Sequence, residues 1–506
     1  MDRQPANSPA AAPAPGAASV SPTPPVVVLE KHKPRTLRRA LVFVTISCGF
    51  WAVWNYCVNG APRIRFADSM GMSEFGYGLL GAMPHAGLLI QVISSYLMEK
   101  YGGRKRIFLF AGITHRAMWI LIALIPWVPG VSPDHHWWLL LMMIWATTSL
   151  GNLSDPAWLV WMADFVPDRI RGRYFARRGQ VGRFVGMAMT LLVGFILDRA
   201  MADAGGDPRI VQRTVSALFI VGAVCGIIDI ALFKWVPDEH RRDHTKPIDF
   251  FQMLAQPLKH PAFRRFLAFR GTLFFGIGYI EVFVWKYLLD DVVKMSNWQA
   301  NLMLVAIPMI SSMLTFPIWG RLVDKLGCRP VLLIAGVLIT HGAVSWAFVT
   351  HDGWHGDSWW IGYMAVLSAA MAWPGVELAS QNLLLQMADT DNNKAGGSAY
   401  VAVHSVVIGI AGSLSGVFGG TIAETLKDWH DEWMGMTVTY HGLLFLISAG
   451  IRLASLVWLI GMPEPESYTA RAALRYMVAS IYTQVQVVVV APFRGLAKLK
   501  RFTFRK

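Results

Sequence analysis

Carboxylate side chains interrupt three of the long apolar segments of the chain. Asp155 lies beside Pro156, Glu281 lies one helical turn before Trp285, and Glu377 lies within a third segment. A charged side chain at the centre of a bilayer costs about 2.5–3.5 kcal/mol on insertion scales, so each one needs a partner or a function. A protonated carboxyl is far less costly to bury than a carboxylate. These three residues are therefore candidates for coupling a proton or another cation to the movement of a solute.

Amide and aromatic side chains accompany the carboxylates at helical spacing. Asn152 lies three residues before Asp155, and Glu377 lies four residues after Trp373, so each pair shares one helix face. Aromatic rings offer flat apolar surfaces to a sugar-like or aromatic solute. The candidate cavity residues are Trp51, Trp54, Asn55, Tyr56, Asn152, Asp155, Glu281, Trp285, Trp373, Glu377 and Gln381. The alternative is that these groups only form structural hydrogen bonds between helices.

Other polar or small residues in the apolar segments have plainer explanations. Charged groups that can pair structurally between helices are His115, Arg116, Arg183 and Asp229. Histidines that occur singly, without the spacing of metal ligands, are His85, His341 and His404. We assign these histidines to packing, with a proton relay as the alternative for one of them. A ridge of small residues for close helix packing is formed by Gly412, Gly416 and Gly420.

Twelve apolar segments must position these residues. The chain has 506 residues, of which 54% are hydrophobic and only 15% are charged, unlike an ordinary soluble domain. Lipid offers no partner for a free backbone group, so each segment that crosses about 30 Å of hydrocarbon must be a helix. The predicted spans are 40–60, 77–98, 107–129, 137–163, 175–198, 213–235, 266–289, 298–319, 331–350, 358–386, 398–424 and 438–461. The fold class expected is an all-α integral membrane protein.

One loop occurs twice in the chain, 225 residues apart. Residues 95–105 read SYLMEKYGGRK and residues 320–330 read GRLVDKLGCRP, so an acid, a base, a glycine and an arginine recur in register. The tripeptide Met-Ala-Asp recurs at the same offset, at 162–164 and 387–389. Two anchors that share one offset indicate a duplicated half of about two hundred residues, which is typical of secondary transporters. We therefore expect two pseudo-symmetric six-helix bundles.

The repeat also relates the polar residues to one another. Subtracting 225 places Glu377 on Asn152 and Glu281 on Tyr56. Polar groups thus occupy matching depths in the first, fourth, seventh and tenth predicted spans. Because an accidental distribution would not favour these four spans, we expect their polar side chains to serve one site between the two halves.

The distribution of charge predicts topology and domains. The net charge is +14, but 33 Lys and Arg lie in the loops and tails of one side and 8 on the other. This bias places both termini in the cytoplasm, so the basic charge indicates membrane topology rather than nucleic-acid binding. The predicted domains are a disordered tail at 1–36, a first bundle at 37–236, a linker with a surface helix at 237–262, a second bundle at 263–462 and a basic, membrane-associated tail at 463–506.

The repeated loop resembles that of the major facilitator superfamily. The loop of that family between spans two and three reads Gly-x-x-x-Asp-Arg/Lys-x-Gly-Arg-Arg/Lys, and it often recurs between spans eight and nine. Residues 320–330 match at the glycine, acid, base, glycine and arginine, with Pro330 in place of the last base. Residues 95–105 have Ser95 for glycine, Glu99 for aspartate and the additional Gly103. By span count and repeat, the resemblance covers residues from about 35 to 462.

The resemblance implies that spans one, four, seven and ten line a cavity between the halves and that cytoplasmic loops gate it. The segment 164–178 is similar to the cytoplasmic loop between spans four and five, and Asp164 and Asp168 are expected partners for its five arginines. The gating candidates are Glu99, Lys100, Arg104, Asp164, Arg171, Arg173, Asp324, Lys325 and Arg329. Paired charges there can latch the outward-open state. Alternatively, these charges only fix topology.

The combined prediction is a secondary active transporter that moves a small solute by alternating access, coupled to a proton or cation. We expect a monomer in a bacterial inner membrane, with the lipid bilayer as its surroundings and no nucleic-acid partner. The alternatives are a uniporter or exporter, and a membrane sensor or assembly protein that has lost transport. The sequence has no phosphate-binding Gly-x-x-x-x-Gly-Lys-Ser/Thr, no His-Glu-x-x-His and no Gly-x-Ser-x-Gly motif. We therefore expect no enzyme activity, no cofactor and no metal.

Overall fold

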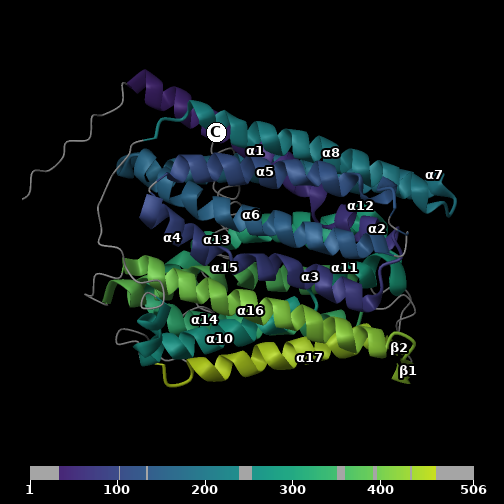
Figure 1. Cartoon of the computed structure of the whole chain (residues 1–506). Helices are drawn as coiled ribbons and strands as arrows, with labels where there is room; N and C mark the ends of the chain where they lie inside the picture. Colours follow the sequence, from purple (N-terminus) through teal and green to yellow (C-terminus); the bar gives the residue numbers. More distant parts are fainter. Residues whose placement is uncertain are drawn as a thin grey trace, which may run out of the picture.

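The computed structural model describes residues 34–101, 103–130, 132, 135–238, 254–349, 359–390, 396–433 and 436–462. These residues form a layered bundle of long helices with one small β-hairpin (Figure 1). The predicted tails, except for the helical residues 34–36, lie outside the described residues, as do residues 239–253 of the linker. The predicted disorder, surface helix and membrane association of these segments stay predictions.

The first half consists of α1 to α8. Its helices are α1 (Pro34–Val58), α2 (Ala61–Asp68), α3 (Glu74–Leu88), α4 (Gln91–Tyr101), α5 (Arg104–Ala123), α6 (His136–Phe165), α7 (Asp168–Ala204) and α8 (Pro208–Leu232). Short 3-10 turns follow α5 at Ile125–Trp127 and α8 at Phe233–Trp235. The α2 helix continues the first span after Gly60, whose φ of 71° suits glycine.

The second half consists of α10 to α17. Its helices are α10 (Pro261–Gly278), α11 (Glu281–Lys286), α12 (Asn297–Asn301), α13 (Ile307–Leu326), α14 (Cys328–Trp346), α15 (Trp359–Thr390), α16 (Gly396–Thr425) and α17 (Tyr440–Ser455). This half also has two π-helical turns, Tyr287–Asp291 and Leu302–Ala306. It has 3-10 turns at Pro257–Lys259 and Leu456–Leu459. Strands β1 (His430–Trp433) and β2 (Met436–Thr439) form an antiparallel hairpin before α17.

Twelve helical spans cross the described bundle. Eleven of them are long and apolar enough to cross a membrane, and they coincide with eleven of the predicted spans. The twelfth predicted span is α6, whose 30 residues give a length of about 45 Å. Polar residues of α6, among them Asn152 and Asp155, lower its hydropathy. The prediction of twelve transmembrane helices in two six-helix bundles is confirmed.

Besides the step at Gly60 in the first span, the described part of the second and seventh spans is broken, and one break bears on the candidate site. The second span breaks between α3 and α4 at Leu89 and Ile90, shortly after Pro84, which cannot donate a backbone hydrogen bond. The seventh span breaks between α10 and α11 at Tyr279 and Ile280. This second break places Glu281 at the first residue of α11.

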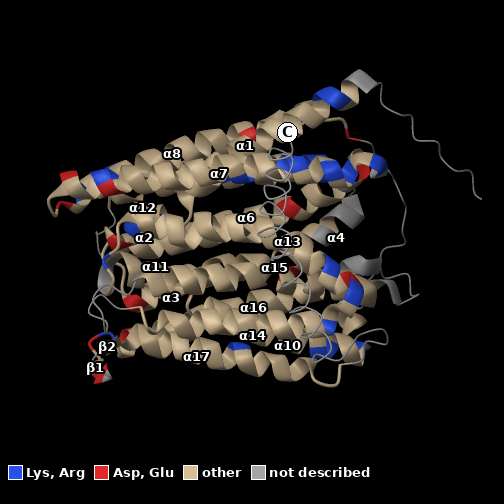
Figure 2. Cartoon of the chain, turned by 180° about the vertical axis from the view of Figure 1, so that it is seen from behind, with Lys and Arg blue, Asp and Glu red and all other residues tan. Residues whose placement is uncertain are grey.

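Charge distinguishes the two ends of the bundle. Lys and Arg gather mainly at one end, which we name the basic end (Figure 2). The opposite end contains α2, α11, the start of α12 and the β-hairpin, and we name it the far end (Figure 1). The two halves meet along two seams, where α3 packs against α16 and α7 packs against α12.

Glycines allow the α3–α16 seam to close. A Cβ added at Gly78 would lie 2.4 Å from the Gly416 carbonyl oxygen and 2.4 Å from the Gly420 Cα. The small-residue ridge of the sequence therefore lies against another helix, as expected for close packing in lipid.

We expect Gly78→Ala to lower the apparent melting temperature of the purified protein by at least about 5 °C, because the added methyl group overlaps backbone atoms that cannot rotate away. Gly450→Ala in α17 is the matched control, since a Cβ there has nothing within 4 Å. A thermal unfolding curve in detergent measures both. Equal melting temperatures for the two variants would contradict the close approach of α3 and α16.

Candidate functional site

A cavity of about 630 Å³ lies in the first half and reaches the second half at Met309. The Tyr56 hydroxyl donates a hydrogen bond to Met309 Sδ over 3.5 Å, so the wall of the cavity joins α1 to α13. The volume is in the range that accommodates small ligands. The residues that line it are Cys48, Trp51, Tyr56, Phe108, Gly112, His115, Arg116, Gly151, Ser154, Asp155, Trp158, Leu159, Arg178, Gly179, Gly182, Arg183, Asp229, Ile230, Phe233 and Met309.

Three predicted site residues lie in this lining. Trp51 and Tyr56 come from α1, and Asp155 comes from α6. Trp158, one turn after Asp155 on α6, adds a further aromatic ring, as do Phe108 and Phe233. The cavity therefore presents aromatic surfaces beside a carboxylate, an arrangement that suits a polar solute with a flat face.

A buried ion pair, Arg116 with Asp229, forms part of the cavity lining. Arg116 Nη2 lies 3.5 Å from Asp229 Oδ2, and the two side chains are 7% and 5% exposed. The Arg116 guanidinium lies 3.4 Å from the ring centre of Trp54, which gives a cation–π contact. Asp155 is close enough to Arg116 to interact with it electrostatically. One buried cation thus faces two carboxylates, so the structural pairing predicted for Arg116 and Asp229 is present.

The remaining predicted residues of α1 and α6 have local contacts. Trp54 is 7% exposed, and its ring lies under Arg116 inside the first half. Asn55 Oδ1 accepts a hydrogen bond of 3.1 Å from Asn59 Nδ2, one turn along the chain. Asn152 Nδ2 donates a hydrogen bond of 2.9 Å to the carbonyl of Thr148. These contacts hold the side chains against their own half.

Glu281 lies at the junction of the two halves. Its Oε2 lies 3.4 Å from His85 Nε2 of α3, and half of its side chain is exposed. Arg63 of α2 is close enough to Glu281 to interact electrostatically with it. The ring of Trp285 lies against Gly60 of the first half. His85, which the sequence assigns to packing, is therefore a polar partner of a candidate coupling residue.

Glu377 lies near a second buried arginine. Arg270 Nε donates a hydrogen bond of 3.2 Å to His404 Nε2, and Nη1 donates one of 3.3 Å to Ser380 Oγ. Glu377 is close enough to Arg270 to interact with it electrostatically. The fourth span of each half thus carries a carboxylate beside a buried arginine. Trp373 packs against the core of the second half, and Gln381 is exposed.

Two gating candidates at the basic end, Arg104 and Arg171, contact residues of their own half. Arg104 pairs with Asp164 of α6 and lies 3.7 Å from Asp238 Oδ1. Arg171 donates hydrogen bonds to the Val166 carbonyl over 3.3 and 3.2 Å. Of the other gating candidates, Arg173, Asp324 and Lys325 are exposed, Arg329 is half-buried, and the side chains of Glu99 and Lys100 lie outside the described part. The Arg104 pairs brace the first half in this conformation.

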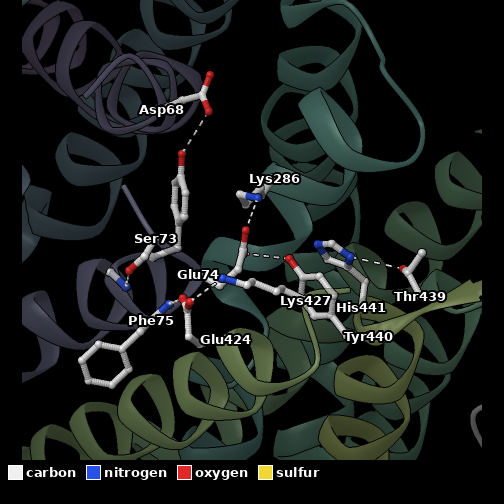
Figure 3. Close-up of polar contacts among 12 residues, drawn as sticks. Asp68, Ser73, Glu74, Phe75, Lys286, Glu424, Lys427, Thr439, Tyr440 and His441 are labelled. Carbon is white, nitrogen blue, oxygen red and sulfur yellow. Dashed lines mark hydrogen bonds and ion pairs between the residues drawn. The ribbon is translucent and has the colours of Figure 1, made fainter. Parts of the chain in front are cut away.

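Hydrogen bonds between the two halves lie at the far end (Figure 3). Lys286 Nζ of α11 donates a hydrogen bond to Glu74 Oε1 of α3, and the side chains are 10% and 14% exposed. The Tyr440 hydroxyl donates to Glu74 Oε2 over 2.7 Å. The backbone N–H of Phe75 donates to Glu424 Oε2 over 3.1 Å. We name Glu74, Lys286 and Tyr440 the far-end latch.

The second seam is also polar. Asp198 of α7 accepts hydrogen bonds from the backbone N–H groups of Asn297 and Trp298, over 2.6 and 2.9 Å, at the first residues of α12. Arg65 Nε donates to Asn297 Oδ1 over 2.9 Å. An acid at a helix start satisfies donors that have no partner within the helix. Both seams are therefore closed by specific hydrogen bonds at the far end.

Comparison with solved structures shows the same fold at low sequence identity, and no curated protein sequence is significantly similar to the chain. A mutant of the nucleoside transporter NupG has a TM-score of 0.61 and 11% identity, covering 85% of this chain and 100% of that one. A D-xylose-proton symporter has a TM-score of 0.61 and 14% identity, covering 85% of this chain and 99% of that one. A bacterial homolog of the human lysosomal transporter Spinster, in an inward-facing and unoccupied conformation, has a TM-score of 0.59 and 15% identity. The match covers 88% of this chain and 98% of that one.

The sequence profile of the Major Facilitator Superfamily matches residues 40–416, which is most of the chain. The match includes both copies of the repeated loop and the residues that line the cavity. The chain is an integral membrane protein with a transporter fold, and it belongs to the Major Facilitator Superfamily.

Proposed function

We propose that the protein moves a small polar solute with a flat face across the membrane by alternating access, with proton or cation coupling. The observation that supports this most is the cavity of about 630 Å³, whose lining combines Trp51, Trp158 and Asp155. Rings of this kind stack on sugar or base faces, and a carboxylate accepts hydrogen bonds from hydroxyl or amino groups. The names of the similar structures, which include a nucleoside transporter and a D-xylose-proton symporter, agree with such a solute.

The polar seams support a transport cycle in which the two ends open in turn. Both seams are closed at the far end, and the similar Spinster homolog is described as inward-facing. The excess of Lys and Arg at the basic end supports a cytoplasmic location for that end. The described state is then the cytoplasm-facing one, in which the solute leaves or enters from the basic end.

The positions of the three carboxylates suggest a different role for each of them. Asp155 lies in the cavity, where the solute competes with Arg116 for it. Glu281 lies between the halves and contacts His85, so a proton bound there changes a contact that both halves share. Glu377 stays beside Arg270 in the second half. We assign the coupling proton to Glu281 and solute contact to Asp155.

A binding screen followed by uptake tests this function. Sugars, nucleosides, amino acids and organic acids are added to the purified protein at two pH values, and a ligand that binds the native state raises its melting temperature. We expect Asp155→Asn to weaken binding of the solute at least tenfold, because a carboxylate acceptor is lost from the cavity. Asp203→Asn, an exposed carboxylate at the end of α7, is the control.

Coupling is measured separately, with Glu281→Gln in proteoliposomes. We expect loss of pH-driven accumulation while exchange of labelled solute continues, because the glutamine cannot release a proton. If Glu281→Gln accumulated solute as well as the unchanged protein does, Glu281 would not carry the coupling proton.

If Asp155→Asn bound the solute with unchanged affinity, the cavity would not be the solute-binding site.

A further inference from the structure

Three arginines form an exposed row on α7 at the basic end. Arg169, Arg173 and Arg177 are all exposed and follow one another at intervals of four residues, so they lie on one helix face over about 12 Å. Figure 2 shows a basic stretch at the start of α7. The row is not explained by the cavity or by the far-end latch.

The other arginines of the same segment turn toward the protein. Arg171 bonds to the Val166 carbonyl. Arg178 Nε donates to the Val44 carbonyl over 3.2 Å, and its guanidinium lies 4.7 Å from the ring centre of Trp158. The carboxylate expected to pair with this segment, Asp164, contacts Arg104 instead. The side chain of Asp168, the other expected partner, lies outside the described part.

The face that carries the row continues into the lipid-facing surface of α7. Val181, Phe184 and Phe195 lie on the same face at helical spacing, and they are 39%, 72% and 63% exposed. Exposed apolar side chains on a transmembrane helix meet the acyl chains of the bilayer. One helix face therefore changes from apolar to cationic over a single turn, between Val181 and Arg177.

We propose that this face is a binding site for an anionic phospholipid, whose acyl chains lie along Val181 and Phe184 while its phosphodiester contacts Arg177, Arg173 and Arg169. The guanidinium group suits this role because it donates paired hydrogen bonds to phosphate oxygens. Cations at the level of the headgroups attract anionic lipids, and the attraction is strongest where several of them converge. The opposite face of α7 supplies Arg178 and Arg183 to the cavity, so the lipid borders the helix that carries part of the candidate site.

Native mass spectrometry of the full chain tests the site with phosphatidylglycerol and phosphatidylcholine of the same acyl length. We expect phosphatidylglycerol to bind at least tenfold more tightly than phosphatidylcholine. The triple variant Arg169→Gln, Arg173→Gln, Arg177→Gln is expected to lose this preference. If that variant does not fold, Arg173→Gln alone is expected to reduce the preference several-fold.

The control variant removes the same charge from the same end of the bundle. Arg106, Arg264 and Arg321 are exposed arginines on α5, α10 and α13, and their joint replacement by glutamine is expected to leave the lipid preference within twofold. If both triple variants lost the preference for phosphatidylglycerol equally, the preference would come from the overall surface charge. That result would overturn the proposed site. Displacement of phosphatidylglycerol by millimolar inorganic phosphate would also overturn it, because the ligand would then be a free anion.

Discussion

Replacing Glu74 by alanine is expected to open the far end of the bundle. Glu74 accepts hydrogen bonds from Lys286 and Tyr440, and its removal leaves the Lys286 ammonium, which is 10% exposed, without this acceptor. Breaking one side of a buried ion pair costs about 3–5 kcal/mol. If about 3 kcal/mol of this falls on the closed far end, its population relative to the open state falls roughly one-hundredfold.

Hydrogen exchange followed by mass spectrometry measures the opening. In Glu74→Ala we expect faster exchange in the peptides that contain the start of α3, the end of α11 and the start of α17, with little change at the basic end. Glu432→Ala, which removes an exposed carboxylate on β1 at the same end, is the control and is expected to leave exchange unchanged. Unchanged exchange in Glu74→Ala would mean that the far-end latch does not hold this state closed.

Replacing Arg116 by leucine is expected to destabilise the first half by about 3–5 kcal/mol, or roughly 10 °C in apparent melting temperature. The variant leaves Asp229, which is 5% exposed, without its ion-pair partner and with only the electrostatic interaction with Arg178 to offset its charge, and Asp155 loses the same partner. It also removes the guanidinium that lies on Trp54. Asp229→Leu is expected to cost less, because Arg116 keeps both Asp155 as a compensating charge and its contact with the Trp54 ring.

The double variant Arg116→Leu with Asp229→Leu separates stability from transport. Two apolar residues of similar volume can replace a buried ion pair at little cost, so its melting temperature should be closer to that of the unchanged protein than that of Arg116→Leu. Transport should stay impaired, because both of these charged groups of the cavity lining are gone. Full transport in this stable variant would show that the Arg116–Asp229 pair serves only the stability of the protein and not transport.

The spans and the duplication could be predicted because lipid leaves few solutions. A backbone without water must be helical, so hydropathy alone locates the spans to within a few residues. Even α6, which is not among the eleven most clearly apolar spans, was predicted as an apolar segment long enough to cross the membrane. The breaks at Leu89 and Tyr279 were not predicted, since they depend on how neighbouring helices satisfy the backbone.

The candidate site could be predicted only in part. Depth along a helix follows from residue number, so the sequence places Asp155, Glu281 and Glu377 inside the membrane. Rotation and tilt of each helix come from packing, and these decide that Asp155 lines the cavity, Glu281 meets His85, and Glu377 lies near Arg270. The far-end latch was missed because Glu74 and Lys286 lie at helix ends, where charges are ordinary, and only their approach across 212 residues distinguishes them.

The central claim is that the two halves move so that the ends open in turn. Electron paramagnetic resonance distances between spin labels test it, in a background without the four native cysteines. One label pair spans the halves at the far end, Asp203 with Trp429, and the other spans them at the basic end, Arg106 with Arg321. On introduction of Glu74→Ala, we predict that the far-end distance lengthens while the basic-end distance shortens. Distances that stay fixed, or that lengthen together, would contradict alternating access in this protein.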